Sequence, residues 1–164
     1  MSTPAQSTES RVAVSLRPAR REEHWLIVRR ILREGLDPTK LDWRRFVMAE
    51  DADGAILGFA QMKHFSTGER EFGSLVVEPE ARGQGIGGRL LVHFLDTFPR
   101  PIYLFCGLHN VSYYRRFGFR LLPADVELPG DLQRKWRMAR FFVRVFKVKV
   151  AAMVMDVEMD GLKN

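Results

Sequence analysis

A glycine-rich segment between a strand pattern and a helix pattern most strongly limits what this chain can fold into. Residues 82–88 read Arg-Gly-Gln-Gly-Ile-Gly-Gly and follow an apolar, strand-like stretch at 70–77. Apolar residues at helical spacing then run from 84 to 98, where prolines end the pattern. A glycine-rich first helical turn exposes unpaired backbone N–H groups without Cβ atoms, which suits a bound phosphate. The segment therefore predicts a strand, a phosphate-binding loop and a helix in succession.

The remaining patterns predict a sheet with both antiparallel and parallel neighbours. Alternating or continuous apolar stretches predict strands or extended segments over 12–17, 45–50, 55–65, 70–77, 102–106, 119–122 and 149–158. Helical spacing predicts helices over 20–35, 84–98, 110–117 and 132–146. Short turns at 51–54 and 66–68 make an antiparallel meander of three strands before the glycine-rich segment. Strand, helix and strand after such a meander predict an α+β, or mixed α/β, class.

Composition limits the size and the partners. The 164 residues, 46% hydrophobic and 28% charged, fit one globular domain. We expect a disordered tail over 1–10 and a single domain over 11–164. The net charge of +6 suits a polyanionic partner such as a nucleotide, a phosphorylated cofactor or nucleic acid.

The single cysteine and the short apolar runs bear on location and metal binding. Cys106 alone can form neither an intramolecular disulfide nor a multi-thiolate zinc site, so we expect no metal and a cytoplasmic location. The longest run of aliphatic residues and methionine, over 150–155, is far shorter than the ~20 residues that span a bilayer. We therefore expect no membrane partner.

Three phosphate loops compete for the glycine-rich segment. A Walker loop ends in Gly-Lys-Ser/Thr, whereas this chain has Gly88-Arg89-Leu90. The spacing of Gly83, Gly85 and Gly88 matches a dinucleotide fingerprint, but that fingerprint follows the first strand of a βαβ unit and not a meander. The run from Leu75 to Gly87 instead closely resembles the coenzyme A loop of the GNAT acyltransferase superfamily. A glycine turn that only lets a helix and a strand pack closely is the alternative.

This resemblance implies a cofactor site. In the family, the N–H groups of the loop bind the pyrophosphate of acyl-CoA. The resemblance assigns that contact to Arg82, Gly83, Gln84, Gly85, Ile86, Gly87 and Gly88. It also implies that the preceding strand binds the acetyl carbonyl and the pantetheine through its backbone, beside a bulge where it splays from its neighbour. The residues concerned are Leu75, Val76 and Val77.

A second segment, Asn110 to Phe119, resembles the C-terminal signature of the same family, with an aromatic-Tyr pair and a Gly-Phe ending. By that resemblance Tyr114 is the acid that protonates the leaving CoA thiolate, and Asn110 and Tyr113 contact the cofactor. A phenol with a pKa near 10 is well matched to a thiolate. The alternative is an aromatic residue packed in the core with its hydroxyl group satisfied.

A general base is less clearly indicated. Glu71 is the first candidate and Glu69 the second, because both lie on or just before the strand at 70–77 and share a face by period two. A solvated glutamate at a strand edge is an equally good interpretation of each. His109 is a further candidate for a base or a substrate contact, or it is a loop residue without a chemical role.

The C-terminal helix is strongly basic on one side. Its cationic cluster comprises Arg134, Lys135, Arg137, Arg140, Arg144, Lys147 and Lys149. A solvated face is one interpretation, and a rim that attracts an acidic substrate is another. Binding of single-stranded nucleic acid would need exposed aromatic residues among the charges. Trp136 and Phe142 are the candidates, but periodicity places Trp136 inside.

The resemblance covers nearly the whole chain. It implies a mixed, mostly antiparallel sheet of about seven strands flanked by helices. It also implies direct transfer of an acetyl group from acetyl-CoA, the co-substrate, to a primary amine of a small molecule or a protein. Homodimers are common in the family, so a homodimer is a further possible partner. A CoA-binding module without catalysis and a basic nucleic-acid-binding domain are the alternatives, and of the two we least expect nucleic acid.

Overall fold

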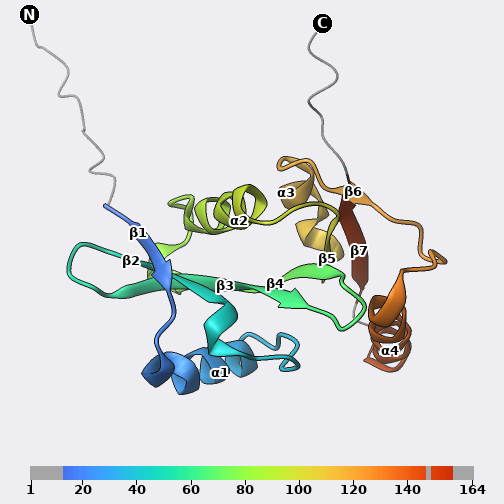
Figure 1. Cartoon of the computed structure of the whole chain (residues 1–164), viewed down its shortest axis with the longest axis horizontal. Coiled ribbons are helices and arrows are strands. Elements are labelled where there is room, and N and C mark those ends of the chain that lie inside the picture. Colours follow the sequence, from blue (N-terminus) through green and yellow to red (C-terminus); the bar gives the residue numbers. More distant parts are fainter. Residues whose placement is uncertain (1–12, 147–148, 157–164) are drawn as a thin grey trace, which may run out of the picture.

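The computed structural model describes residues 13–146 and 149–156 and contains one seven-stranded sheet in that part of the chain (Figure 1). The predicted tail at 1–10 lies outside the described residues. The strands are β1 (Ser15–Pro18), β2 (Phe46–Glu50), β3 (Ile56–His64), β4 (Arg70–Val77), β5 (Ile102–Gly107), β6 (Arg120–Leu121) and β7 (Val150–Met155). The helices are α1 (His24–Arg33), α2 (Ile86–Thr97), α3 (Val111–Arg115) and α4 (Gly130–Phe146). Single 3-10 turns are η1 (Arg21–Glu23), η2 (Trp43–Arg45), η3 (Pro79–Ala81) and η4 (Leu108–Asn110).

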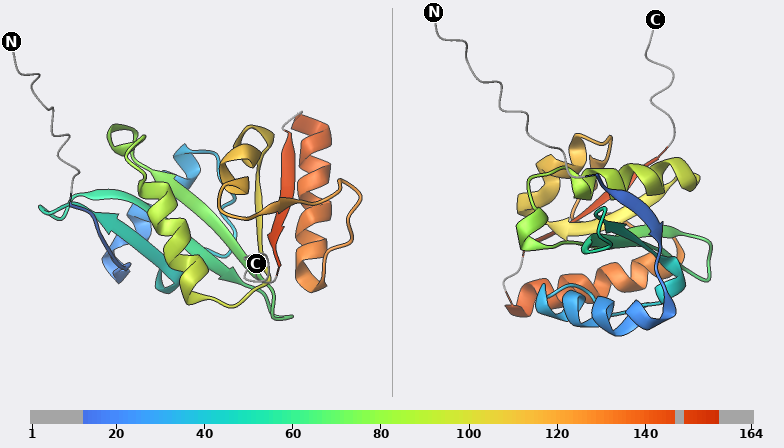
Figure 2. Two further views of the ribbon diagram at one scale, coloured as in Figure 1. Left: turned by 90° about the horizontal axis from the view of Figure 1, so that it is seen from above. Right: turned by 90° about the vertical axis from the view of Figure 1, so that its left-hand side faces the viewer.

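The sheet is mixed and mostly antiparallel, as predicted. Its strand order is β1-β2-β3-β4-β5-β7-β6, and β4 with β5 is its parallel pair. Helices α2 and α3 lie on one face, and α1 and α4 lie on the other (Figure 2). The predicted α+β class is therefore confirmed.

Most predicted elements occur within a few residues of their expected ends. The N-terminal helix starts later than expected because residues 21–23 form a 3-10 turn, closed by Glu23, whose carboxylate accepts the Arg20 N–H at 2.7 Å. Helix α2 begins at Ile86, and not at residue 84, because Gly85 has a φ of +78° and cannot belong to a right-handed helix. The last strand ends at Met155 in the described part of the chain, and residues 157–158 of its predicted span lie outside it.

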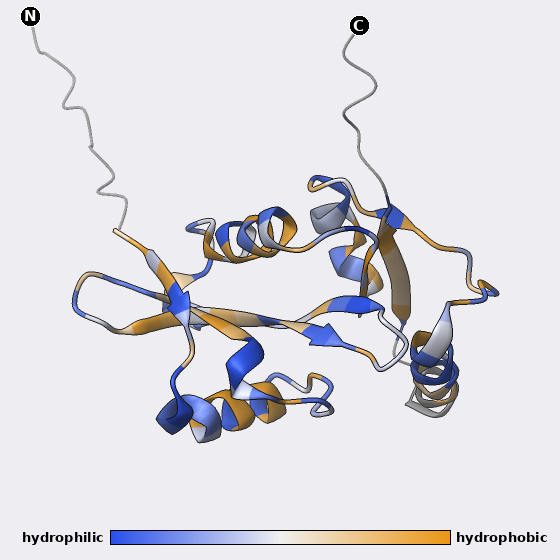
Figure 3. Cartoon of the chain, viewed as in Figure 1, coloured by the Kyte–Doolittle hydropathy of each residue, from blue (hydrophilic) through white to orange (hydrophobic). Residues whose placement is uncertain are grey.

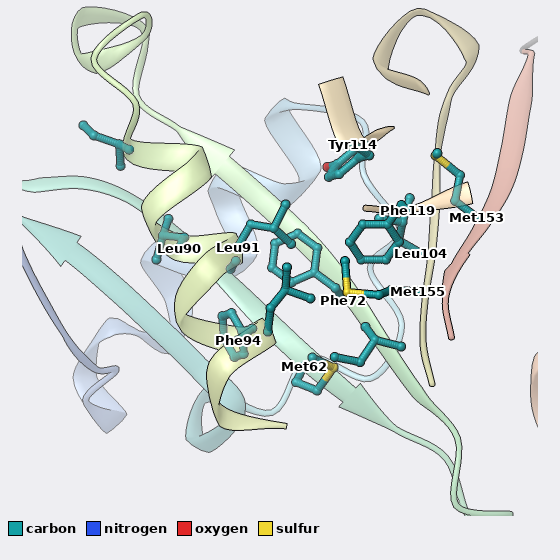
Figure 4. Close-up of a cluster of buried hydrophobic side chains, with 14 of the residues drawn as sticks. Met62, Phe72, Leu90, Leu91, Phe94, Leu104, Tyr114, Phe119, Met153 and Met155 are labelled. Atoms are coloured by element: carbon teal, nitrogen blue, oxygen red, sulfur yellow. The ribbon is translucent and has the colours of Figure 1, made fainter. Parts of the chain in front are cut away.

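Each face of the sheet has its own apolar core. On the α2 face, Leu91 and Phe94 pack against Phe72 and Met62 of the sheet (Figure 4). On the other face, α1 and α4 bury separate clusters, and Trp136 of α4 is inside as predicted. Hydrophobic and hydrophilic residues alternate around α1 and α2, as expected for helices with one side against a sheet (Figure 3). Strand β4 lies between the cores of the two faces, with Phe72 buried in one and Val76 in the other.

Candidate active site

The parallel strands β4 and β5 separate soon after they meet. Their register contains one pair, Glu71 with Tyr103, in the described part of the chain. The left view of Figure 2 shows the two strands close at one end and apart at the other. Backbone groups on this edge of β4, from Gly73 to Val77, therefore face a gap and not a partner strand. This gap has the form that the family resemblance implied.

A β-bulge lies on β4 beside the gap. Phe59 pairs with Val76 and Gln61 with Gly73, so Ser74 and Leu75 together face the single residue Ala60 of β3. Ser74 has a φ of +53°, a left-handed conformation that costs a residue with a side chain about 1–2 kcal/mol. Its hydroxyl group accepts a hydrogen bond from the buried Gln61 side chain, with Nε2 2.8 Å from Oγ.

The glycines before α2 serve two different purposes. Gly83 and Gly85 both have a φ of +78°, and a Cβ atom at either would meet nothing within 4 Å, so the backbone conformation alone requires glycine. A Cβ at Gly87 would instead lie 3.0 Å from the Tyr113 hydroxyl oxygen, and one at Gly88 would lie 3.1 Å from the Phe117 ring. The run thus turns the chain at the helix N-terminus and also lets α2 pack closely on α3.

Other side chains of the loop make local contacts. The half-exposed Arg82 side chain donates from Nε to the carbonyl oxygen of Val77 at 3.1 Å, and its guanidinium group forms an ion pair with Glu34 at 3.2 Å. Gln84 donates from Nε2 to the carbonyl oxygen of Glu80 at 3.2 Å, and Ile86 is buried. These contacts fix the loop against the end of β4 and leave its backbone to meet a ligand.

A cleft of about 700 Å³ runs along α2 and α3 beside this loop. Its lining comprises Leu16, Gly85, Gly88, Arg89, Val92, His93, Asp96, Tyr113, Arg116 and Phe117. Arg89 and Arg116 place two cations there, and the Arg116 guanidinium lies 5.0 Å from the centre of the Tyr113 ring. Sequence reasoning did not single out these arginines, because an arginine on a helix is most often simply solvated.

Tyr114 is buried between α3 and the sheet. Its ring makes an edge contact with the Phe119 ring, with ring centres 6.1 Å apart (Figure 4). A second edge contact joins it to the Tyr113 ring, whose centre is 5.1 Å away. Burial, with smaller contributions from Cys106 and Tyr113, raises the pKa of Tyr114 above its ordinary value. The phenol is therefore protonated at neutral pH and can act as a proton donor.

Cys106 is a half-buried residue of β5 and lies near Tyr114 of α3. Burial raises the pKa of Cys106 to about 11, which keeps it a thiol at neutral pH. Since the thiolate is the nucleophilic form, Cys106 is poorly suited to carry an acyl group.

The segment between β5 and α3 contributes two predicted residues. Asn110 is exposed at the N-cap of α3, and its side chain makes no capping hydrogen bond. The ring of the exposed His109 lies over Gly107, where a Cβ would be 2.6 Å from the imidazole Cε1 atom. The roles assigned to both side chains stay predictions.

Four charged side chains from four segments meet on the α1/α4 face of the sheet, and we call them the charged cluster: Asp37, Lys63, Glu71 and Lys135. The Lys135 ammonium lies 2.6 Å from each oxygen of Glu71 and 2.7 Å from Asp37 Oδ2. The buried Lys63 ammonium lies 2.8 Å from the same Asp37 oxygen. The cluster joins the segment after α1 to β3, β4 and α4, and sequence patterns gave no signal for it.

Charge balance governs the titration of this cluster. Burial alone would raise the pKa of Asp37, but the Lys135 and Lys63 ammonium groups outweigh it and hold that pKa well below its usual range. Burial lowers the pKa of Lys63, and the neighbouring Lys135 lowers it further. For Lys135, burial is outweighed by Glu71 and Asp37, which raise its pKa.

The structure places the two candidate bases in different surroundings. The Glu71 side chain is almost fully buried and both of its oxygens contact Lys135. Glu69 lies in the turn before β4, where its carboxylate accepts a hydrogen bond from Thr67, close to the start of α4 at Gly130. Their expected roles in catalysis stay predictions.

Fold and site together define an α+β protein whose sheet opens between two parallel strands, below a glycine-rich helix N-terminus. Residues 42–121 match the family model described as Acetyltransferase (GNAT) domain, so the resemblance predicted from the sequence is confirmed over that part of the chain. A curated relative, mycothiol acetyltransferase from Actinosynnema mirum, is 34% identical over 89 residues, which cover 50% of this chain and 30% of the relative.

Solved structures share the fold at low identity. N-acetylglutamate synthase from Neisseria gonorrhoeae, complexed with coenzyme A and N-acetyl-glutamate, superposes with a TM-score of 0.70 at 22% identity, over 89% of this chain and 35% of the other. Rv2747 from Mycobacterium tuberculosis, in complex with CoA and NLQ, gives 0.69 at 15% identity, over 88% and 99%. The chain thus spans about a third of the length of the curated relative and of the synthase. Among the described residues, no helix has the length and apolar character needed to cross a membrane.

Proposed function

We propose that this chain transfers an acetyl group from acetyl-CoA to a primary amine by direct attack within a ternary complex. The observation that carries the proposal is the gap between β4 and β5, beside which the glycine-rich N-terminus of α2 packs against α3, the helix that carries Tyr114. In the reaction, the amine nitrogen bonds to the acetyl carbon, the carbon–sulfur bond breaks, and the sulfur leaves as a thiolate.

The proposed roles follow from the positions of the groups. The N–H groups over 82–88 would hold the pyrophosphate, helped by the partial positive charge of the helix N-terminus. The β4 backbone at Leu75, Val76 and Val77 would bind the acetyl carbonyl and the pantetheine, and an N–H group there would stabilise the developing oxyanion. Tyr114 would give its proton to the thiolate. Asn110, Tyr113 and the lining of the cleft complete the proposed cofactor site.

The acceptor decides whether a base is needed. An alkyl ammonium with a pKa near 10.4 is neutral in only about 1 of 2,500 molecules at pH 7, whereas an α-amino group is neutral in roughly 10–20%. We propose Glu71 first and Glu69 second as a base. Glu71→Gln tests this role. Loss of a base should lower kcat/KM more for an alkyl amine than for an α-amine, whereas loss of the ion pair alone should lower the melting temperature and leave kcat/KM of the folded protein unchanged. Thr97→Gln, at the exposed end of α2, is a control variant that should keep the wild-type kcat/KM and melting temperature.

We further propose that residues 11–164 form one domain and that the acceptor is a small molecule or a protein amine. A homodimer and a cytoplasmic location stay predictions. A nucleic-acid-binding function is less well supported, because Trp136 is buried and stacked on Phe105, with ring centres 5.5 Å apart, which leaves Phe141 as the exposed aromatic residue on the described part of this helix. A CoA-binding module without catalysis is the other alternative.

One experiment separates these functions. Acetyl-CoA is incubated with a panel of amino acids, polyamines, other small amines and peptides with free N-termini or lysines, and CoA release is followed with a thiol reagent. Acceptor-dependent release supports the transferase. CoA binding without CoA release from acetyl-CoA in the presence of any amine supports the binding module. Affinity for DNA or RNA that falls steeply with salt, without CoA binding, supports the nucleic-acid domain.

A further inference from the structure

We infer that Gln61 is a positioning residue that fixes the β4 backbone for reaction with the thioester. The inference rests on the proposed function, because it concerns the backbone proposed to bind the acetyl carbonyl. Gln61 lies on β3, its side chain has no exposed surface, and substrate therefore does not reach it. Any effect it has on the reaction must pass through its neighbours, above all through the residue to which its side-chain amide donates a hydrogen bond.

That residue is Ser74, at the bulge. In the described part of the chain, Ser74 and Lys40 are the residues other than glycine with positive φ, and Ser74 lies inside a strand. The hydrogen bond from Gln61 Nε2 to Ser74 Oγ, at 2.8 Å, joins the two strands at the register shift. It ties the side chain of the left-handed residue to a rigid strand, and thereby opposes relaxation of the bulge to an ordinary extended conformation.

The bulge is supported from one side only. Past Glu71, β4 has no registered partner on its β5 edge among the residues that the structure describes, so β3 must supply its rigidity. The Glu78 N–H donates to the carbonyl oxygen of Leu57 in β3, at 2.9 Å. Because successive backbone groups of a strand point to opposite edges, the N–H of Val77 points toward the gap. A relaxed bulge would shift the direction of this and the preceding N–H groups.

Packing does not explain a glutamine at this position. Its carbonyl oxygen Oε1 is buried and has no hydrogen-bond partner in the described part of the chain. A buried polar atom without a partner destabilises the fold, and an apolar side chain of similar length would avoid that loss. Stability alone therefore does not account for the amide at this position, whereas a contribution to the geometry of the bulge does.

The test compares Gln61→Met with the wild type through the bound acetyl group. We expect the dissociation constant for acetyl-CoA to rise about fivefold to tenfold, and that for CoA to change less than about twofold, because only acetyl-CoA has the carbonyl that the bulge binds. Difference infrared spectra with ¹³C-carbonyl acetyl-CoA provide a second measurement. Binding to the wild type should shift the carbonyl stretch to lower frequency, and binding to the variant should not. Gln133→Met on α4 is the matched control: it removes a side-chain amide whose Oε1 accepts a hydrogen bond from the Leu128 N–H, and it should keep both properties.

A double-mutant cycle tests whether Gln61 acts through Ser74. Ser74→Gly keeps the left-handed conformation accessible but lacks the hydroxyl anchor, so we expect it to lose the carbonyl shift as well. Adding Gln61→Met to Ser74→Gly should then change nothing further. A full carbonyl shift in Ser74→Gly, or additive effects in the cycle, would overturn the inference, even if Gln61→Met fails to fold. Failure of the proposed function looks different, because the wild type would then bind neither CoA nor acetyl-CoA.

Discussion

On the α2/α3 face of the sheet, many of the groups proposed to hold the cofactor are glycines and backbone N–H groups, beside a cleft that Gly85 and Gly88 help to line. On the α1/α4 face, the polar groups are ionised side chains that already contact one another, as in the charged cluster. The first face is arranged to receive an anion, whereas the second has largely satisfied its own charges. Changes on the first face should therefore mainly alter binding and turnover. Changes on the second should mainly alter stability, and at Glu71 the proposed role as a base adds an effect on turnover.

The largest effect is expected for Gly87→Glu. The new side chain would start 3.0 Å from the Tyr113 hydroxyl and bring a negative charge to the helix N-terminus, where the pyrophosphate is proposed to lie. Titration calorimetry should show at least a hundredfold loss of acetyl-CoA affinity, about 3 kcal/mol or more. Thr97→Glu, which adds the same charge at the exposed far end of α2, should bind normally. Equal affinity in both variants would contradict the loop assignment.

Tyr114→Phe tests the proton donor proposed on the same face and leaves the charge of that face unchanged. Loss of the proton donor should lower kcat about tenfold to a hundredfold and leave the affinity for acetyl-CoA within about twofold. Since burial raises the pKa of Tyr114, wild-type kcat should not fall from loss of this proton until the pH exceeds about 10. Tyr103→Phe is the matched control, at the other end of the gap. A normal kcat in Tyr114→Phe would exclude the acid role.

Lys135→Met should mainly affect stability. It leaves the buried Glu71 carboxylate without its ammonium partner, and breaking a buried pair on one side costs about 3 kcal/mol. Urea unfolding should show that loss. Arg134→Met, the adjacent and mostly exposed helix position, should cost less than about 1 kcal/mol. If the two variants were equally stable, the charged cluster would not hold α4 to the sheet.

The smallest effect, and the one that depends on pH, is expected for Asp37→Asn. Because its side chain is about a third exposed, we expect a loss of only about 1–2 kcal/mol at pH 7. The folded-state pKa of Asp37 is lowered, so its contribution is complete above the ordinary aspartate value of about 3.9 and declines as the pH falls below it. The difference between wild type and variant in urea unfolding should thus shrink from pH 7 to pH 3. Asp53→Asn in the exposed β2–β3 turn should show no such trend, and a constant gap for Asp37→Asn would contradict the prediction.

The face proposed to hold the cofactor could be predicted from the sequence because the signals that point to it are local. Gly83 and Gly85 are needed by the backbone conformation of one loop, and Tyr114 lies in a short motif, so neighbouring residues in the chain suffice to identify them. Strand β4 was predicted with its observed ends for the same reason, since an alternating stretch between turns is a local pattern. Local signals could not show that Gly87 and Gly88 also make room for α3.

The sequence by itself determined the order of the elements, the α+β class and the loop that points to acetyl-CoA, because period, turn residues and glycines act over a few neighbours. Only the tertiary structure brought Asp37, Lys63, Glu71 and Lys135 together, and only it showed the bond between Gln61 and Ser74. These contacts join residues up to 98 positions apart, as Asp37 and Lys135 are. Each such residue, taken alone in the sequence, is an ordinary charged or strand residue. Strand pairing and helix packing determine which distant residue becomes its partner, and the neighbouring residues in the chain do not indicate that partner.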